Sequence, residues 1–138
     1  MARFQTPALT LGQQQWLMSR NFPAFKYSRQ NNIATWKGTL QPTSKSPSYV
    51  VKVSYRYANQ ISKSPKVWVL SPRVHPNAKH RYADESLCLY YQKDGSWSPH
   101  MFIGETIIPW ASLWLLFYEI WLDTDYWFGP EAPHYGPK

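Results

Sequence analysis

Acidic residues are missing from the first 83 positions of the chain. All eight Asp and Glu residues lie at Asp84 or later, whereas thirteen of the fifteen Lys and Arg residues lie at or before Arg81. A basic half suits an acidic protein partner, nucleic acid or simply a soluble surface. Nucleic acid is the least favoured, because the basic residues are spaced singly and do not cluster with aromatic residues on one element.

Cysteine is nearly absent too, since Cys88 is the only one. It cannot form an internal disulfide, and no charged and apolar leader precedes the domain, so we expect a reducing cytoplasm. One cysteine and four scattered histidines without zinc-finger spacing predict no metal site, and nothing suggests another cofactor. No protease signature surrounds Cys88, which argues against a cysteine protease.

The chain also lacks a long hydrophobic run. The longest, from Thr106 to Leu122, contains Pro109 and Glu119 and is shorter than the roughly 20 residues that span a bilayer. Because Pro suits a first helical turn and the run is apolar on nearly every face, it predicts a helix over 109–122 that is buried on a sheet. We therefore expect no membrane association.

What the chain does contain fits one domain spanning residues 1–138, with loosely structured ends at 1–8 and 129–138. Thr10 is a suitable N-cap for a first helix of about ten residues, which Pro23 ends. Alternating apolar residues bounded by turn residues predict strands at 25–28, 33–40, 49–57 and 66–70. The expected fold is α+β: an N-terminal helix, a four-stranded antiparallel meander and a buried central helix.

Four short motifs follow one another between the last strand and the central helix. They are Pro65-Lys66-Val67, His75-Pro76-Asn77, Cys88-Leu89 and Trp97-Ser98-Pro99. In this order they resemble the active-site segment of ubiquitin-conjugating enzymes (E2 enzymes). The resemblance implies the ubiquitin-conjugating (UBC-like) fold, here with its C-terminal helices missing or truncated. The Asn77 to Cys88 gap is a few residues longer than is usual in the eukaryotic enzymes.

The resemblance implies roles for these residues. Cys88 would carry an acyl group as a thioester, since a thiolate attacks an activated carboxyl and the thioester then yields to an amine. Asn77 would donate to the oxyanion formed in that attack, or brace the loop. Other residues would support the active-site turn: His75, Pro76 and Trp97. Three loop residues could position an incoming lysine or act as its general base: Tyr82, Asp84 and Glu85.

In the same family the first helix docks the activating enzyme through a basic face. Basic residues near the first helix here are Arg3, Arg20, Lys26 and Arg29. We expect these residues to dock a partner. The alternative, that the first helix merely has a solvated polar face, explains the same residues equally well.

The segments HRYADESLCLYY, ETIIPWASLWLLFYEIWL and W-x-G-x-E-A-P-H resemble the E2-like proteins of short type II CBASS antiphage systems. That implies a transferase whose acyl donor is a cGAS-like nucleotidyltransferase, with an activating enzyme as a further possible partner. Transfer of its C-terminus to an amine would prime cyclic-oligonucleotide signalling. Two alternatives remain open: a non-catalytic binding module on the same fold, and the conjugating enzyme of a bacterial ubiquitin-like pathway.

Overall fold

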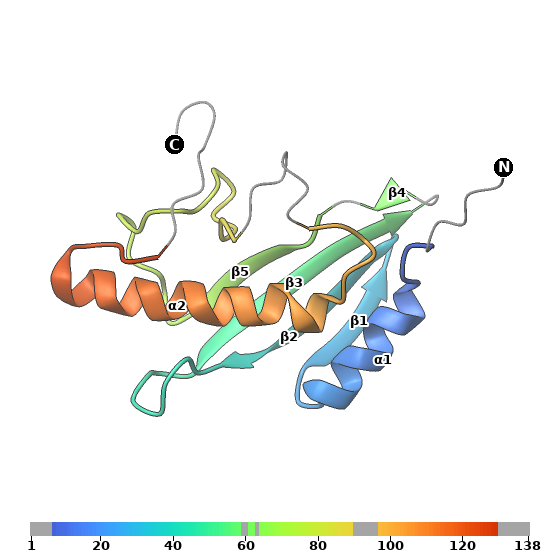
Figure 1. Ribbon diagram of the computed structural model, residues 1–138, viewed down its shortest axis with the longest axis horizontal. Helices are drawn as coiled ribbons and strands as arrows, with labels where there is room; N and C mark the ends of the chain where they lie inside the picture. The colour runs from blue at the N-terminus through green and yellow to red at the C-terminus, as the bar shows by residue number, and fades with distance from the viewer. Residues whose placement is uncertain (1–6, 59–60, 63, 90–96, 130–138) are drawn as a thin grey trace, which may run out of the picture.

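The computed structural model describes residues 7–58, 61–62, 64–89 and 97–129, and the remainder of the chain is drawn in grey (Figure 1). Its elements follow in order: α1 (Leu11–Asn21), β1 (Lys26–Gln30), β2 (Ile33–Leu40), β3 (Tyr49–Ala58), β4 (Ile61–Ser62), β5 (Lys66–Ser71), the 3₁₀ helix η1 (Ile103–Glu105) and α2 (Ile107–Thr124). This confirms the predicted α+β class and the order of helix, sheet and helix.

The first helix begins at the predicted cap. The backbone N–H of Gln13 donates to Thr10 Oγ1 at 3.1 Å, and the N–H of Thr10 donates to Gln13 Oε1 at 2.8 Å. This reciprocal pair is a capping box, which satisfies backbone donors that the first turn would leave unpaired. The buried face of α1 contains Gln14, Leu17 and Met18.

The sheet is an antiparallel meander in which β1 pairs with β2, β2 with β3, and β3 with β5. All four predicted strands form within two residues of the expected bounds. One correction is needed: a fifth strand, the two-residue β4, pairs with the end of β3 inside the segment predicted to be a break. It was not predicted because a strand of two residues is too short to show an alternating pattern.

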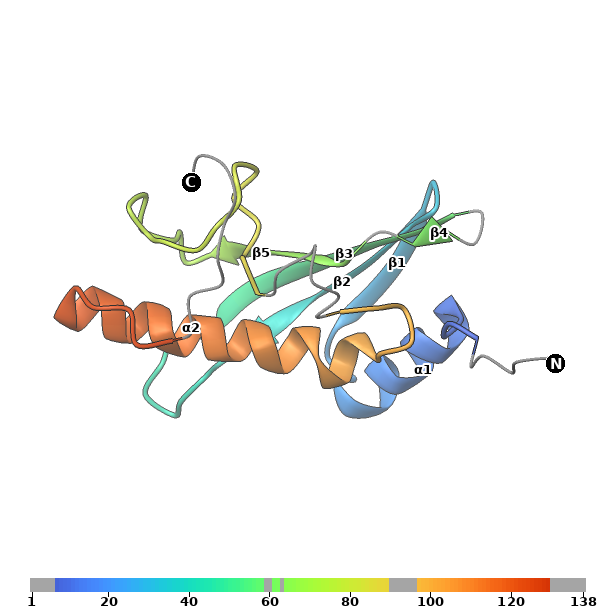
Figure 2. The same cartoon turned by 45° about the horizontal axis from the view of Figure 1, so that its top comes forward.

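Both helices cover the same face of the sheet (Figure 2). Side chains alternate between the two faces of a strand, so β3 places Val51, Val53 and Tyr55 in the core, with Lys52, Ser54 and Arg56 on the outer face. Trp36 of β2, which is 1% exposed, fills the centre of this layer.

The central helix α2 starts two residues before, and ends two residues after, the predicted range 109–122. Pro109 lies in its first turn, where a backbone N–H has no helical partner, so the helix can start upstream of it. Asp125 caps the C-terminus in the left-handed conformation, with φ of 62°. In the part of the chain that the structure describes, no helix is long and apolar enough to cross a membrane.

Among the described residues, which extend to Gly129, no helix follows α2. Most of the two ends predicted to be loosely structured, 1–6 and 130–138, lies outside the described residues.

Candidate functional site

Cys88 directly follows a small hairpin in the segment between β5 and η1. Arg81 and Leu87 form an antiparallel bridge, and the N–H of Tyr82 donates to the carbonyl of Ser86 at 2.9 Å. Glu85, with φ of 71°, closes the turn. We call residues 80–88 the cysteine hairpin. It accounts for the long gap between Asn77 and Cys88, because the additional residues form an ordered element of their own.

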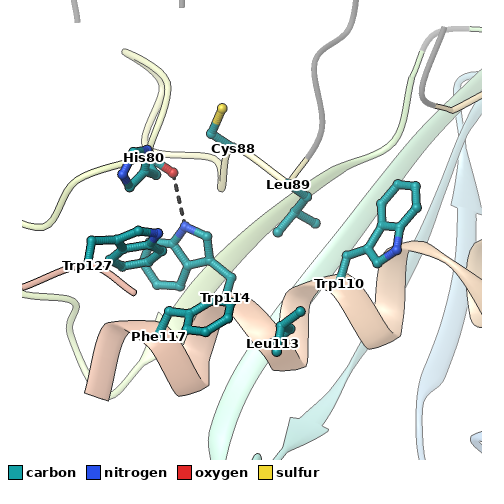
Figure 3. Close-up of a pocket in the computed structure, with 8 residues that line it drawn as sticks. All are labelled: His80, Cys88, Leu89, Trp110, Leu113, Trp114, Phe117 and Trp127. Atoms are coloured by element: carbon teal, nitrogen blue, oxygen red, sulfur yellow. Dashed lines mark hydrogen bonds between the residues drawn. The ribbon is translucent and has the colours of Figure 1, made fainter. Parts of the chain in front are cut away.

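A backbone hydrogen bond holds the cysteine hairpin against β5, and a side-chain hydrogen bond from Trp114 holds it against α2. The N–H of Leu87 donates to the carbonyl of Val67 in β5 at 2.8 Å. The carbonyl of His80 accepts two hydrogen bonds, from the N–H of Cys88 at 2.8 Å and from Nε1 of Trp114 in α2 at 3.1 Å (Figure 3). The backbone of Cys88 is therefore fixed relative to the core, while its side chain remains partly exposed.

His75, Pro76 and Asn77 form a turn, which we call the HPN turn. The N–H of His75 donates to Tyr118 Oη of α2 at 2.8 Å, and the His75 ring packs edge-on against Trp121. His75 Nδ1 accepts from the N–H of Asn77 at 3.0 Å. Pro76 and Asn77 are exposed, so the amide group of Asn77 is presented at the surface by a turn whose backbone is anchored.

Arg81 joins the HPN turn to the cysteine hairpin. Its Nη2 donates to the carbonyls of His75 at 3.3 Å and Pro76 at 3.4 Å, while its backbone bridges to Leu87, next to Cys88. Its bracing role could not be inferred, because nothing in the sequence shows that an arginine side chain folds back onto carbonyls five and six residues earlier.

Asp84 is engaged by its neighbours at the tip of the cysteine hairpin. Its carboxylate accepts from Lys66 Nζ at 2.6 Å and from the N–H of Ser86 at 2.9 Å and its Oγ at 2.5 Å. Burial alone would raise the pKa of Asp84, but these hydrogen bonds outweigh it and lower the pKa to about 2. A carboxylate with this pKa is a poor proton acceptor at neutral pH.

The other two residues expected to position a lysine are Tyr82, which is half-buried, and Glu85, whose side chain is 78% exposed. Glu85 lies 3.9 Å from Arg81 Nη1. Trp97, expected to support the active-site turn, is buried. It packs edge-on against Tyr55 and donates to Thr106 Oγ1 at 3.0 Å. Its described contacts thus join the sheet to the start of α2.

The structure distributes the predicted docking residues over different surfaces. Arg20 lies on the exposed side of α1 with its guanidinium over the ring of Trp16, and Arg29 lies over the ring of Tyr57. Lys26 pairs directly with Lys37, so it belongs to the outer face of the sheet, opposite the helices. Arg3 lies outside the described residues.

Beside Cys88 is a pocket of about 240 Å³ with a predominantly aromatic lining (Figure 3). Its wall combines residues of the cysteine hairpin, α2 and the segment after α2: His80, Cys88, Leu89, Trp110, Leu113, Trp114, Phe117 and Trp127. Trp127 packs on the His80 ring with centroids 4.8 Å apart. The sequence did not predict this pocket, and its only sign of one was the apolar character of α2 on nearly every face. Within the described residues, no group of three or more His, Cys, Asp and Glu side chains is suited to hold a metal ion.

The α+β scaffold, the partly exposed cysteine and the anchored HPN turn together resemble those of an E2-like protein. The family model of type II CBASS E2 proteins matches residues 14–135, and the chain belongs to this family. A comparison with curated proteins finds no match. Family membership assigns the chain an E2-like role in CBASS and leaves the chemistry of Cys88 to be argued from the site.

Proposed function

We propose that this protein carries the C-terminus of a cGAS-like nucleotidyltransferase as a thioester on Cys88 and transfers it to an amine. The observation that supports this most strongly is the mounting of Cys88. Its backbone is tied to α2 through the carbonyl of His80, yet its side chain is accessible from outside. A cysteine that served only as a small core residue would have no need of an exposed side chain.

The reaction has two steps. In the first, the Cys88 thiolate attacks a carboxyl carbon that has been activated by another enzyme, a C–S bond forms, and the activating group leaves with its electron pair. In the second, a neutral amine attacks the thioester, a C–N bond forms, the C–S bond breaks so that the Cys88 thiolate leaves with the electron pair, and the nitrogen gives up one proton to solvent. A thiol suits both steps because it is a good nucleophile and a good leaving group. The reducing conditions of the cytoplasm would keep the thiol competent.

Asn77 is proposed to donate its amide N–H to the oxyanion of the second step. The anchoring of its backbone by His75, together with the Arg81 bridge to the cysteine hairpin, supports this role, because a preorganised donor loses little entropy on reaching the oxyanion. Glu85 and Tyr82 remain the candidates to position the incoming amine. Asp84 holds the shape of the hairpin instead, since its carboxylate is already bonded to Lys66 and Ser86.

Non-reducing electrophoresis tests the proposal, using the protein co-expressed with a cGAS-like nucleotidyltransferase in cells where the two confer defence. The wild type is expected to give a thiol-sensitive band of the combined mass, and Cys88→Ala to give none. Asn77→Ala should still form the thioester, and therefore the band, but should transfer the acyl group to the amine about 10²-fold more slowly, the usual effect of one lost oxyanion donor. If the wild type gives no thiol-sensitive band and Cys88→Ala still supports defence, the protein acts by binding alone.

A further inference from the structure

The central helix carries two apolar stripes, and only one of them is covered by the sheet. The covered stripe includes Ala111 and Leu115, which are fully buried. The second stripe has the spacing i, i+3, i+4 and i+7 of one helix face, formed by Trp110, Leu113, Trp114 and Phe117. Leu113 on this stripe remains 45% exposed, so the protein keeps apolar surface open.

This second stripe forms the floor of the pocket beside Cys88. Leu89 closes the pocket from the cysteine hairpin side. The Cys88 sulfur lies at the rim and is turned away from the ring of Trp114 (Figure 3). A group bonded to that sulfur would therefore remain outside the pocket, while a side chain close to it along the same chain could turn in.

We propose that the pocket holds a bulky apolar side chain, aromatic or branched, from the last three residues of the donor's C-terminal tail. The inference rests on the proposed function, because it takes Cys88 as the atom to which the tail is joined. Each extended residue advances about 3.3–3.6 Å, so only the last few residues can enter a pocket that begins at the cysteine itself. The pocket would then select the donor and hold its carbonyl at the sulfur.

The lining favours this occupant over two others. At about 240 Å³ the pocket is smaller than the roughly 300–1,000 Å³ typical of sites for cofactors and drug-sized ligands, and it suits a single side chain. None of the described residues that line it has a carboxylate to neutralise the ammonium group of an incoming lysine. Aromatic rings and leucines with no acidic or strongly basic group match a neutral apolar side chain best.

Direct loading of Cys88 tests this without an activating enzyme. The probes are pentapeptide thioesters of 2-mercaptoethanesulfonate, in which Phe occupies the last, second-last or third-last position of an otherwise Gly and Ser peptide, with the all Gly and Ser peptide as reference. Transthioesterification adds the peptide to Cys88 and releases the small thiol, and intact-mass spectrometry follows its rate. Each rate is divided by that of N-acetylcysteine with the same thioester, which removes differences in intrinsic reactivity.

We expect at least one Phe peptide to load about tenfold faster than the reference, which corresponds to about 1.4 kcal/mol. Leu113→Ser should abolish this preference. Leu122→Ser is the matched control, because Leu122 is an equally exposed leucine of α2, 50% against 45%, and does not line the pocket. Thermal unfolding of both variants verifies that they are folded.

The outcomes separate the two proposals. If Cys88 loads every peptide faster than N-acetylcysteine but without preference for Phe, the pocket inference is wrong and the proposed function stands. If no peptide reacts faster with Cys88 than with N-acetylcysteine, both the pocket inference and the proposed function are wrong. If Leu113→Ser leaves loading unchanged and instead slows release to added lysine, the pocket serves the acceptor and the inference is overturned.

Discussion

Removing a single oxygen from Tyr118 should loosen the HPN turn and leave the fold intact. Tyr118→Phe deletes the acceptor of the His75 N–H, which lies 2.8 Å away, and retains the ring that stacks on Trp114 and Trp121. One hydrogen bond contributes a net 0.5–1.5 kcal/mol, and because His75 is exposed, water can replace the lost acceptor. We expect a loss of about 1 kcal/mol in the free energy of unfolding.

The same change should be visible locally. If the His75 amide exchanges through opening of this turn, a loss of about 1 kcal/mol accelerates its hydrogen exchange by about fivefold. Acyl loading of Cys88 should be little affected, whereas transfer to an amine should slow, because the turn that presents Asn77 is less well held. Hydrogen-exchange mass spectrometry and single-turnover transfer assays measure the two effects.

Tyr49→Phe is the matched control. Tyr49 Oη donates to Glu119 Oε2 at 2.7 Å, and its pKa is raised by burial and by this hydrogen bond. Losing a hydrogen bond to a carboxylate should lower stability by about 1.5–3 kcal/mol, more than Tyr118→Phe does, without changing exchange at His75. Equal acceleration at His75 in both variants, or none in Tyr118→Phe, would refute the argument that Tyr118 holds the turn.

Three further predictions concern stability and docking. Asp84→Asn should lower the free energy of unfolding by about 1 kcal/mol, a value reduced for solvent screening because the side chain is 38% exposed. Because folding lowers the pKa of Asp84, urea unfolding should show the full difference in stability from the wild type above pH 4 and a vanishing difference towards pH 2. Gln14→Leu should lower the free energy of unfolding by about 2–3 kcal/mol in the same assay, because the carbonyl of Met101 and the N–H of Ile103, the first residue of η1, lose their hydrogen-bond partner. Arg20→Glu and Lys26→Glu, tested separately, should differ in their effect on the rate of association with the nucleotidyltransferase, because the two residues lie on opposite sides of the sheet, and only the residue that faces the partner should slow association in a salt-dependent way. Wild-type association rates for both variants would exclude both surfaces.

The sequence predicted the helices and the longer strands well, because helix capping and side-chain alternation depend on residues close together in the chain. Thr10 with Gln13 specifies the start of α1, and strict alternation along β3 separates the core residues from the outer face. β4 was missed because two residues carry no periodicity. The sequence also did not predict two side-chain contacts at the site, those of Arg81 with the HPN turn and of Asp84 with Lys66 of β5.

The candidate site was predictable as a set of motifs and not as a cavity. The all-round apolar pattern of α2 predicted burial of the whole helix, whereas the structure leaves Leu113 open beside Cys88. Periodicity shows that a face is apolar, and it does not show whether the protein or a partner covers that face. For a similar reason the sequence did not show which surface each docking candidate occupies, since Lys26 and Arg20 are close in sequence and lie on opposite sides of the sheet.

The most direct test of the thioester proposal is the chemical identity of the bond at position 88. Cys88→Ser, co-expressed with the nucleotidyltransferase, should trap an oxygen ester that resists amine attack. Tandem mass spectrometry of its digest should find one species that joins the C-terminal carboxyl of the nucleotidyltransferase to position 88, with the combined mass of the two peptides less one water. An adduct joined at any other position, or none in cells where the wild-type system is active, would contradict the proposal.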